Sequence, residues 1–175
     1  GRRHNFIIAA DSSFGAATLS AFANIFLRKK FAVRVTGDYA WEQSNQRFGV
    51  RDTLDDFQHT RYGAQVEFLR FLQKWTIRQA HQIIAPSEYL KNMAIGWGAV
   101  KDKTTVIYNA APHASNILKE TARKNLGFEP DEKILISAGR LVPWKGFKKL
   151  IELMPELLER YGNLKLIIVG DGPER

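Results

Sequence analysis

The residues best suited to chemistry lie in the stretch SAGRLVPWKG at positions 137–146, between an expected strand and an expected helix. Gly139 permits a sharp backbone turn, Arg140 and Lys145 supply positive charge, and the helix start offers N–H donors. This combination suits a diphosphate. A plain turn with two solvated cations is the alternative interpretation. The stretch is neither a P-loop nor a G-x-G-x-x-G fingerprint, which weakens ATPase and dehydrogenase interpretations.

The elements that position this stretch follow from the alternation of short apolar runs with longer helical patterns, which is typical of βαβ units and a parallel sheet. The apolar residues Phe68, Phe71, Leu72 and Trp75 recur at helical spacing and are interpreted as core. Pro155 is expected to kink the last helix or split it in two. Strands are predicted at 6–10, 32–36, 82–85, 104–108, 134–138 and 164–169, and helices at 15–28, 61–80, 87–96, 119–126 and 147–161.

The chain divides best at residues 109–116, where a short, partly polar segment with a proline follows a strand. The prediction is a first domain at 1–109, a linker at 110–118 and a second domain at 119–175. Residues 37–60 have weak periodicity and many aromatic and acidic side chains. A connection of this length is usually functional or disordered, and the aromatic content favours function.

Composition restricts the chemistry further. The 175 residues include 26 Lys and Arg against 18 Asp and Glu, a formal net charge of +8, which suggests an anionic partner. The absence of cysteine excludes disulfides and thiol catalysis. The four histidines at 4, 59, 81 and 113 show no metal-binding spacing, so no metal site is expected. No apolar run is long enough to predict a transmembrane helix.

Four segments, in the same order, make the chain similar to retaining glycosyltransferases of family 4. They are IIAPSEYLK at 83–91, VIYNAAP at 106–112, GRLVPWKG at 139–146 and IIVGDGPE at 167–174. The resemblance implies an α/β fold of the GT-B type, in which two Rossmann-like parallel-sheet domains face each other across a cleft. Both domains are expected to be incomplete in this chain.

The resemblance also implies donor-site residues in the second domain. Arg140 and Lys145 would bind the donor diphosphate, and Gly139 would let the backbone approach it closely. Gly170, Gly172 and Glu174 would lie at the cleft edge near the nucleotide, although a simple strand-ending turn explains them equally well.

In the first domain the chain departs from the family, because the loop after residues 32–36 lacks the histidine that members often carry near the transferred sugar. Asp38 occupies that place and is the candidate catalytic residue. The acceptor or sugar side is predicted to contain Tyr39, Trp41, Glu42 and Ser87. Helix or turn capping by Asp38 and Ser87, and packing by Trp41, are the alternatives.

The function implied by the resemblance is transfer of a sugar from a nucleotide-diphosphate donor to an acceptor hydroxyl, with retention of configuration. The acceptor would be a glycan, a lipid-linked molecule or a small molecule. A cytoplasmic location is expected, without a cofactor, an obligatory metal or a nucleic-acid partner. Peripheral contact with an anionic membrane stays open. The cluster Arg28-Lys29-Lys30 is most simply explained as positive charge at a helix C-terminus, and contact with a membrane surface or an acceptor lipid is the alternative.

Two rival functions remain at this point. One is another GT-B activity, such as a sugar-phosphate synthase or an epimerase-like enzyme. The other is a non-catalytic, basic α/β module that binds nucleic acid or a membrane surface, although the spread of the basic residues argues against a nucleic-acid interface.

Two further parts of the family pattern, a glycine-rich loop and a pair of glutamates, are expected before Gly1 and after Arg175. The isolated chain is therefore expected to have little transferase activity. It is also expected to fold poorly, because the second sheet would have only two strands.

Overall fold

The computed structural model describes residues 5–10, 15–111 and 116–175, and it contains two compact units, Gly1–Ala111 (unit 1) and Pro112–Arg175 (unit 2). Residues 112–115 of the predicted linker and two of the four histidines, His4 and His113, lie outside the described residues. None of the described helices has the length and apolar content needed to cross a bilayer.

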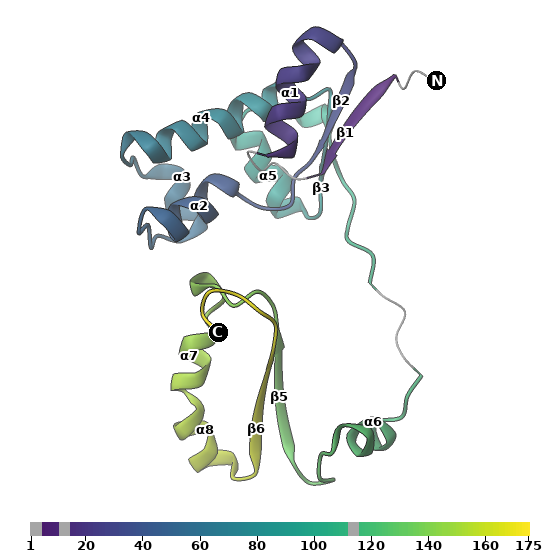
Figure 1. The fold of residues 1–175 in the computed structure, drawn as a ribbon, viewed down its shortest axis with the longest axis vertical. Helices are drawn as coiled ribbons and strands as arrows, with labels where there is room; N and C mark the ends of the chain where they lie inside the picture. Colours follow the sequence, from purple (N-terminus) through teal and green to yellow (C-terminus); the bar gives the residue numbers. More distant parts are fainter. Residues whose placement is uncertain (1–4, 11–14, 112–115) are drawn as a thin grey trace. The chain divides into compact units, whose positions relative to one another are not determined.

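Unit 1 contains a four-stranded parallel sheet with the order β1-β2-β3-β4 (Figure 1). The alternation of apolar runs and helical patterns had predicted these four strands. Along the chain its elements are β1 (Phe6–Ala10), α1 (Ala16–Leu27), β2 (Lys30–Arg34), α2 (Tyr39–Arg47), α3 (Leu54–His59), α4 (Ala64–Gln79), β3 (Gln82–Ala85), α5 (Glu88–Gly96), a 3₁₀ turn (Lys101–Lys103) and β4 (Thr104–Val106).

Alternate side chains of the strands face a single core. Phe31 and Val33 of β2 and Ile83 of β3 are buried there with small residues of α1 and α5 and with Ile77 of α4. The intervening side chains of β1, such as Ile8, are exposed. The described helices α1, α4 and α5 therefore share the core on one face of this sheet.

Unit 2 contains a two-stranded parallel sheet, as the sequence predicted. Pro155 splits the last predicted helix, and it lies in the first turn of the second piece, where a missing N–H is tolerated. The elements are α6 (Lys119–Leu126), β5 (Lys133–Ala138), a 3₁₀ turn (Pro143–Lys145), α7 (Phe147–Glu152), α8 (Met154–Tyr161) and β6 (Leu164–Val169).

Three expectations need correction. First, residues 37–60 are not an irregular connection, because they hold α2 and α3, each started by a capping side chain. The Asp38 carboxylate accepts from the Trp41 N–H, and the Thr53 hydroxyl accepts from the Asp56 N–H. Second, β2 begins and ends two residues earlier than predicted, β4 stops at Val106, and α4 begins at Ala64.

The third correction concerns the apolar stripe on α4. Leu72 is buried and Trp75 partly buried, but Phe68 and Phe71 are largely exposed. The buried face of α4 instead contains Val66, Leu72, Gln73, Thr76 and Ile77. Apolar spacing alone identified the helix but assigned two of its aromatic side chains to the wrong face.

Candidate functional site

The ends of β5 and β6 in unit 2 are joined beyond the sheet by backbone hydrogen bonds. The Gly139 N–H donates to the Val169 carbonyl at 2.9 Å, and the Leu141 N–H donates to the Asp171 carbonyl at 2.9 Å. The Leu141 carbonyl in turn accepts from the Glu174 N–H at 3.1 Å. The loop that carries Arg140 is therefore paired with the loop after β6.

This pairing requires glycine at two positions. Gly170 has φ +157° and Gly172 has φ +158°. A Cβ at Gly170 would overlap the carbonyl oxygen of Gly139, and a Cβ at Gly172 would overlap the backbone of Leu141. Only a residue without a side chain allows two backbones to approach this closely. The predicted residues Gly139, Gly170, Gly172 and Glu174 thus come together in one pair of loops.

The two cations of the candidate site, Arg140 and Lys145, lie on the loop after β5 and are exposed. Arg140 follows the turn, and Lys145 ends the 3₁₀ turn that leads into α7. Gly146 has a left-handed φ of +73°, and the buried Phe147 lies under the turn, with its ring 3.5 Å from where a Cβ of Gly139 would be. The buried Phe147 ring thus packs against the backbone of the turn, while the Arg140 and Lys145 side chains lie at the surface.

One part of the predicted diphosphate geometry changes. The helix expected at residues 147–161 is split, as Pro155 allowed, so the piece that follows the loop is the six-residue α7, with α8 after it. A helix this short contributes little dipole, because the macrodipole is the sum over aligned peptide units. The glycine and the two cations therefore carry this candidate site.

At the carboxyl edge of the unit 1 sheet, Asp38 is 3% exposed and bonded through both carboxylate oxygens. One oxygen accepts from the Trp41 N–H at 3.0 Å and from Gln73 Nε2 at 3.2 Å, and the other accepts from Gln58 Nε2 at 2.8 Å. Trp97 Nε1 donates to Gln58 Oε1 at 3.0 Å, which extends the network to the end of α5.

Burial raises the pKa of the Asp38 carboxyl above its ordinary value of 3.8. The hydrogen bonds from Trp41, Gln58 and Gln73 and the positive charge of Arg70 oppose this effect and lower the pKa. The carboxylate joins α2, α3 and α4 by its contacts and serves as the N-cap of α2, the capping role considered from the sequence.

The other predicted residues of unit 1 lie at the same sheet edge, because β2 and β3 are parallel neighbours and the residues follow them. Tyr39, Trp41 and Glu42 are in the first turn of α2, and the Glu42 carboxylate lies over Gly37. Trp41 Nε1 donates to the Asp52 carbonyl at 2.9 Å. The Ser87 hydroxyl caps α5 by accepting from the Leu90 N–H at 3.2 Å.

Sequence reasoning missed Gln58 and Gln73, which donate to Asp38, and Trp97, which donates to Gln58. These residues are 20, 35 and 59 positions from Asp38 in the sequence, in elements whose packing no short-range pattern reveals. The usable signals were the caps Asp38 and Thr53, which predict the short helices α2 and α3, and α3 brings Gln58 to the network.

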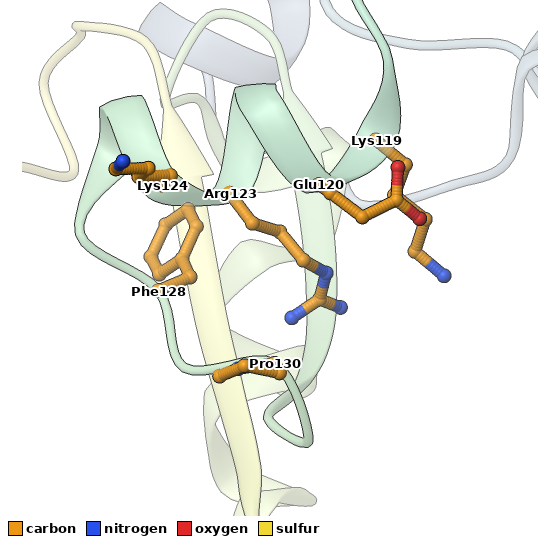
Figure 2. Close-up of a pocket in the computed structure, with 6 residues that line it drawn as sticks. All are labelled: Lys119, Glu120, Arg123, Lys124, Phe128 and Pro130. Atoms are coloured by element: carbon orange, nitrogen blue, oxygen red, sulfur yellow. The ribbon is translucent and has the colours of Figure 1, made fainter.

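A hollow of about 490 Å³ lies beside α6 and is lined by Lys119, Glu120, Arg123, Lys124, Phe128 and Pro130 (Figure 2). The Arg123 guanidinium donates to the carbonyls of Glu129 and Glu132 at 2.8 and 2.9 Å. Lys165 Nζ lies 5.2 Å from the centre of the Phe128 ring. Arg123 thus holds the turn that leads into β5, and the hollow lies apart from the loops after β5 and β6.

Comparison with known proteins shows which proteins this chain is similar to. The family model "Glycosyl transferases group 1" matches residues 119–175, which contain both paired loops. The matched residues make up about a third of the chain, and the match supports the resemblance to glycosyltransferases seen in the sequence.

Two curated relatives agree with this glycosyltransferase assignment. An uncharacterized glycosyltransferase of Methanocaldococcus jannaschii is 38% identical over 101 residues, which cover 54% of this chain and 26% of that protein. A GDP-mannose-dependent monoacylated alpha-(1-6)-phosphatidylinositol monomannoside mannosyltransferase of Corynebacterium glutamicum is 29% identical over 64% of this chain and 27% of its own length. The chain thus spans about a quarter of the length of these relatives.

The fold is that of the GT-B glycosyltransferases. The crystal structure of HepE from Anabaena, in complex with UDP and glucose, matches 97% of this chain and 40% of its own, with a TM-score of 0.68 and 21% identity. The match confirms the fold class for the elements of both units, as the sequence had predicted.

Proposed function

We propose that the complete protein containing this chain is a retaining glycosyltransferase that moves a sugar from a nucleoside-diphosphate donor to an acceptor hydroxyl. The observation that carries the proposal is the pairing of the loops after β5 and β6. Backbone hydrogen bonds join the two loops, Gly170 and Gly172 allow their close approach, and Arg140 and Lys145 lie exposed on the loop after β5. Cations on a fixed turn suit a ligand with two adjacent phosphates.

In this proposal the two cations act on the leaving group. As the glycosidic bond breaks, negative charge grows on the nucleoside diphosphate, and the positive charges of Arg140 and Lys145 stabilise it. Gly139 lets the backbone come close to the phosphates, and Gly170, Gly172 and Glu174 lie on the neighbouring loop, on the nucleotide side. We predict that these side chains replace a metal, so transfer should proceed in the presence of a chelator.

The names of related proteins support a nucleotide-sugar donor but leave its base open. HepE was crystallised with UDP, with UDP and glucose and with UDP-glucose, whereas the mannosyltransferase relative is named for GDP-mannose. Both nucleotides belong in the test.

On the acceptor or sugar side we propose Tyr39, Trp41, Glu42 and Ser87, which share one edge of the unit 1 sheet. Carboxylates and aromatic faces can bind sugar hydroxyls and CH surfaces. Asp38 enters the proposal through the first turn of α2, which it caps, because its own carboxylate is buried and bonded to neighbouring donors. A cytoplasmic location, peripheral contact with an anionic membrane and weak activity of the isolated chain remain predictions.

The test compares nucleoside diphosphates with monophosphates on the complete protein. Titration calorimetry with UDP, UMP, GDP and GMP is carried out on the wild type and on Arg140→Gln and Lys145→Gln. Loss of one charge-assisted hydrogen bond should weaken diphosphate binding by roughly tenfold to a hundredfold. Monophosphate binding should change far less.

Lys148→Gln is the matched control, since Lys148 is an exposed cation on the adjoining helix α7. It should bind UDP and GDP like the wild type. Equal loss in all three variants would indicate a general charge effect and contradict the proposal. Salt-sensitive binding to polyanions, with no competition from UDP or GDP, would favour the non-catalytic anion-binding module instead.

A further inference from the structure

The buried side of α4 carries an amide side chain, that of Gln73. This residue is 4% exposed, and the other buried residues of the helix include Leu72 and Ile77. A buried amide is expected to have partners for both its oxygen and its nitrogen. The start of α2 supplies both, because Gln73 Oε1 accepts from the Ala40 N–H at 3.1 Å and Gln73 Nε2 donates to the Asp38 carboxylate at 3.2 Å.

These two contacts hold the first turn of α2 from outside the helix. The first N–H groups of a helix have no partner within it, so they need acceptors elsewhere. Here the Trp41 N–H donates to Asp38 at 3.0 Å, and the Ala40 N–H donates to Gln73. One amide group of α4 therefore bonds both to the cap of α2 and to the backbone of its first turn.

The same turn carries three of the residues proposed for the acceptor or sugar side, which are Tyr39, Trp41 and Glu42. A movement of the turn relative to α4 would displace all three side chains together. The contacts of Gln73 join buried groups within unit 1, so they do not depend on what covers the surface of this unit in the complete protein.

We propose that Gln73 is a positioning residue, which sets the place of the first turn of α2 against α4 and thereby the place of the three side chains toward the sugar. The inference rests on the proposed function, because the position of these side chains matters to the reaction only if they bind sugar. Gln73 acts through α2 and does not touch the substrate. A misplacement of about 1 Å in such a site can lower a rate about a hundredfold.

The central variant is Gln73→Met, which keeps the length of the side chain and removes both hydrogen bonds. Ala40 and Asp38 each lose one partner, so the first turn of α2 should move. The complete protein labelled with fluorotryptophan reports this movement by fluorine NMR, with the Trp41 signal assigned from Trp41→Phe. The Trp41 signal should shift or broaden in Gln73→Met, while the signal of Trp144 in unit 2 should stay in place.

The functional readout is cleavage of UDP-glucose and of GDP-mannose with water as the acceptor, measured as release of UDP or GDP. Gln73→Met should lower kcat by roughly tenfold to a hundredfold. The affinity for UDP and GDP should be unchanged, because their proposed site lies on the loops of unit 2. A general loss of folded protein would lower both quantities.

Thr76→Val is the matched control on the same helix. The Thr76 hydroxyl shares a buried hydrogen bond of 2.9 Å with the Thr18 hydroxyl of α1, so this variant also loses buried hydrogen bonding, but not at α2. Both Thr76→Val and Gln73→Met should lower the melting temperature. Only Gln73→Met should change the Trp41 signal and kcat.

Gln73→Glu provides a rescue that depends on pH. Its carboxyl group can accept from the Ala40 N–H, but it repels the Asp38 carboxylate unless the two groups share a proton. Relative to the wild type at each pH, the Trp41 signal and kcat of Gln73→Glu should therefore recover as the pH falls from about 8 to about 5.

Other charged groups lie near this pair. Arg70 and Lys74 line the same small hollow as Asp38 and Gln73, and the negative charge of Asp38 acts on Tyr89. All three groups are also present in Gln73→Met, which has no second carboxyl group. Recovery at low pH in Gln73→Met as well would assign the effect to these groups and contradict the proposal.

An unchanged Trp41 signal in Gln73→Met would overturn the proposal, as would equal losses of kcat in Gln73→Met and Thr76→Val. Failure of the proposed function has a different signature, namely a wild type that binds neither UDP nor GDP. The Trp41 signal would then still decide whether Gln73 positions α2.

Discussion

At the carboxyl edge of the unit 1 sheet, polar side chains are buried and bonded to one another, whereas at the same edge of unit 2 the backbone forms the hydrogen bonds. Asp38 illustrates the first arrangement, since Trp41, Gln58 and Gln73 all donate to it. The loop of Gly139 and Leu141 illustrates the second, with Arg140 exposed between them.

The difference shows how one type of sheet edge can serve two purposes. A buried side-chain network fixes helices but leaves its polar atoms little capacity for a ligand. A loop fixed through its backbone leaves the long cationic side chains at the surface, where a phosphate can reach them. By this reasoning unit 1 supplies a rigid frame around its acceptor-side candidates, while unit 2 presents the charge.

The largest effect that would test this comparison is expected from Asp38→Ala. The change removes the N-cap of α2 and takes an acceptor from the buried Gln73 and from Gln58, whose side chain also donates to the Leu54 carbonyl. We expect the free energy of unfolding of unit 1 to fall by about 3 kcal/mol. Urea unfolding can be monitored by tryptophan fluorescence, since Trp41, Trp75 and Trp97 all lie in unit 1.

Thr53→Ala is the control for Asp38→Ala. Thr53 caps α3 in the same manner but is exposed, so its loss should cost only about 1 kcal/mol. If the two variants were equally stable, burial of the Asp38 network would have no special importance, and unit 1 would not differ from unit 2 in the way described.

The second largest effect is expected where backbone hydrogen bonds join the loops after β5 and β6 of unit 2. In Gly170→Ala the new methyl group would overlap the Gly139 carbonyl, so the two loops must separate. We expect a loss of about 2 kcal/mol in the stability of unit 2. If the proposed donor site is correct, UDP or GDP should also bind at least about tenfold more weakly, since Arg140 would lose its fixed position. Fluorescence of Trp144, which lies in the same loop, can report both changes.

Gly162→Ala is the control that distinguishes separation of the two loops from ordinary backbone strain. Gly162 also has a positive φ, of +65°, but nothing lies within 4 Å of the place where its Cβ would be. This variant should lose stability and keep wild-type affinity for the nucleoside diphosphate. Unchanged diphosphate affinity in Gly170→Ala as well would show that the β6 loop does not position Arg140.

The sequence predicted the elements with strong local signals. The six strands are runs of apolar residues between turns, and Pro155 marks the break between α7 and α8. Helices α2 and α3 were missed because they are short and polar, although their caps Asp38 and Thr53 are visible in the sequence. Phe68 and Phe71 were misplaced because periodicity shows that a helix has an apolar face, and only packing shows whether that face is covered.

The candidate donor loop was predicted from residue types, since glycine next to cations is a local pattern. Its pairing with the loop after β6 could not be predicted, because the close approach of Gly170 to Gly139 depends on the register of two strands about 30 residues apart. The Asp38 network was beyond prediction for the same reason. Long-range contacts between polar side chains leave no periodic pattern in the sequence.

The smallest effect is expected at the surface of unit 1, where Tyr89 donates a hydrogen bond to Asp55 at 2.7 Å. The hydrogen bond to Asp55, with burial and negative charge nearby, raises the pKa of Tyr89 from 10.0 to about 12. The folded protein thus keeps a phenolic proton that the unfolded chain loses. This contribution to stability is complete below pH 10 and is lost as the pH rises through about 12.

Asp55→Asn should bring the pKa of Tyr89 back toward 10, because the amide carries no negative charge. Tyrosinate absorbance, measured between pH 10 and 12 under conditions where circular dichroism shows the fold intact, should rise earlier in the variant by the signal of one tyrosine. Tyr62, which bonds to Asp52 instead, should titrate alike in both proteins. Superimposable titration curves would mean that Asp55 does not hold Tyr89 in solution, and unit 1 would then have polar side chains at its surface that its own contacts leave available to a ligand.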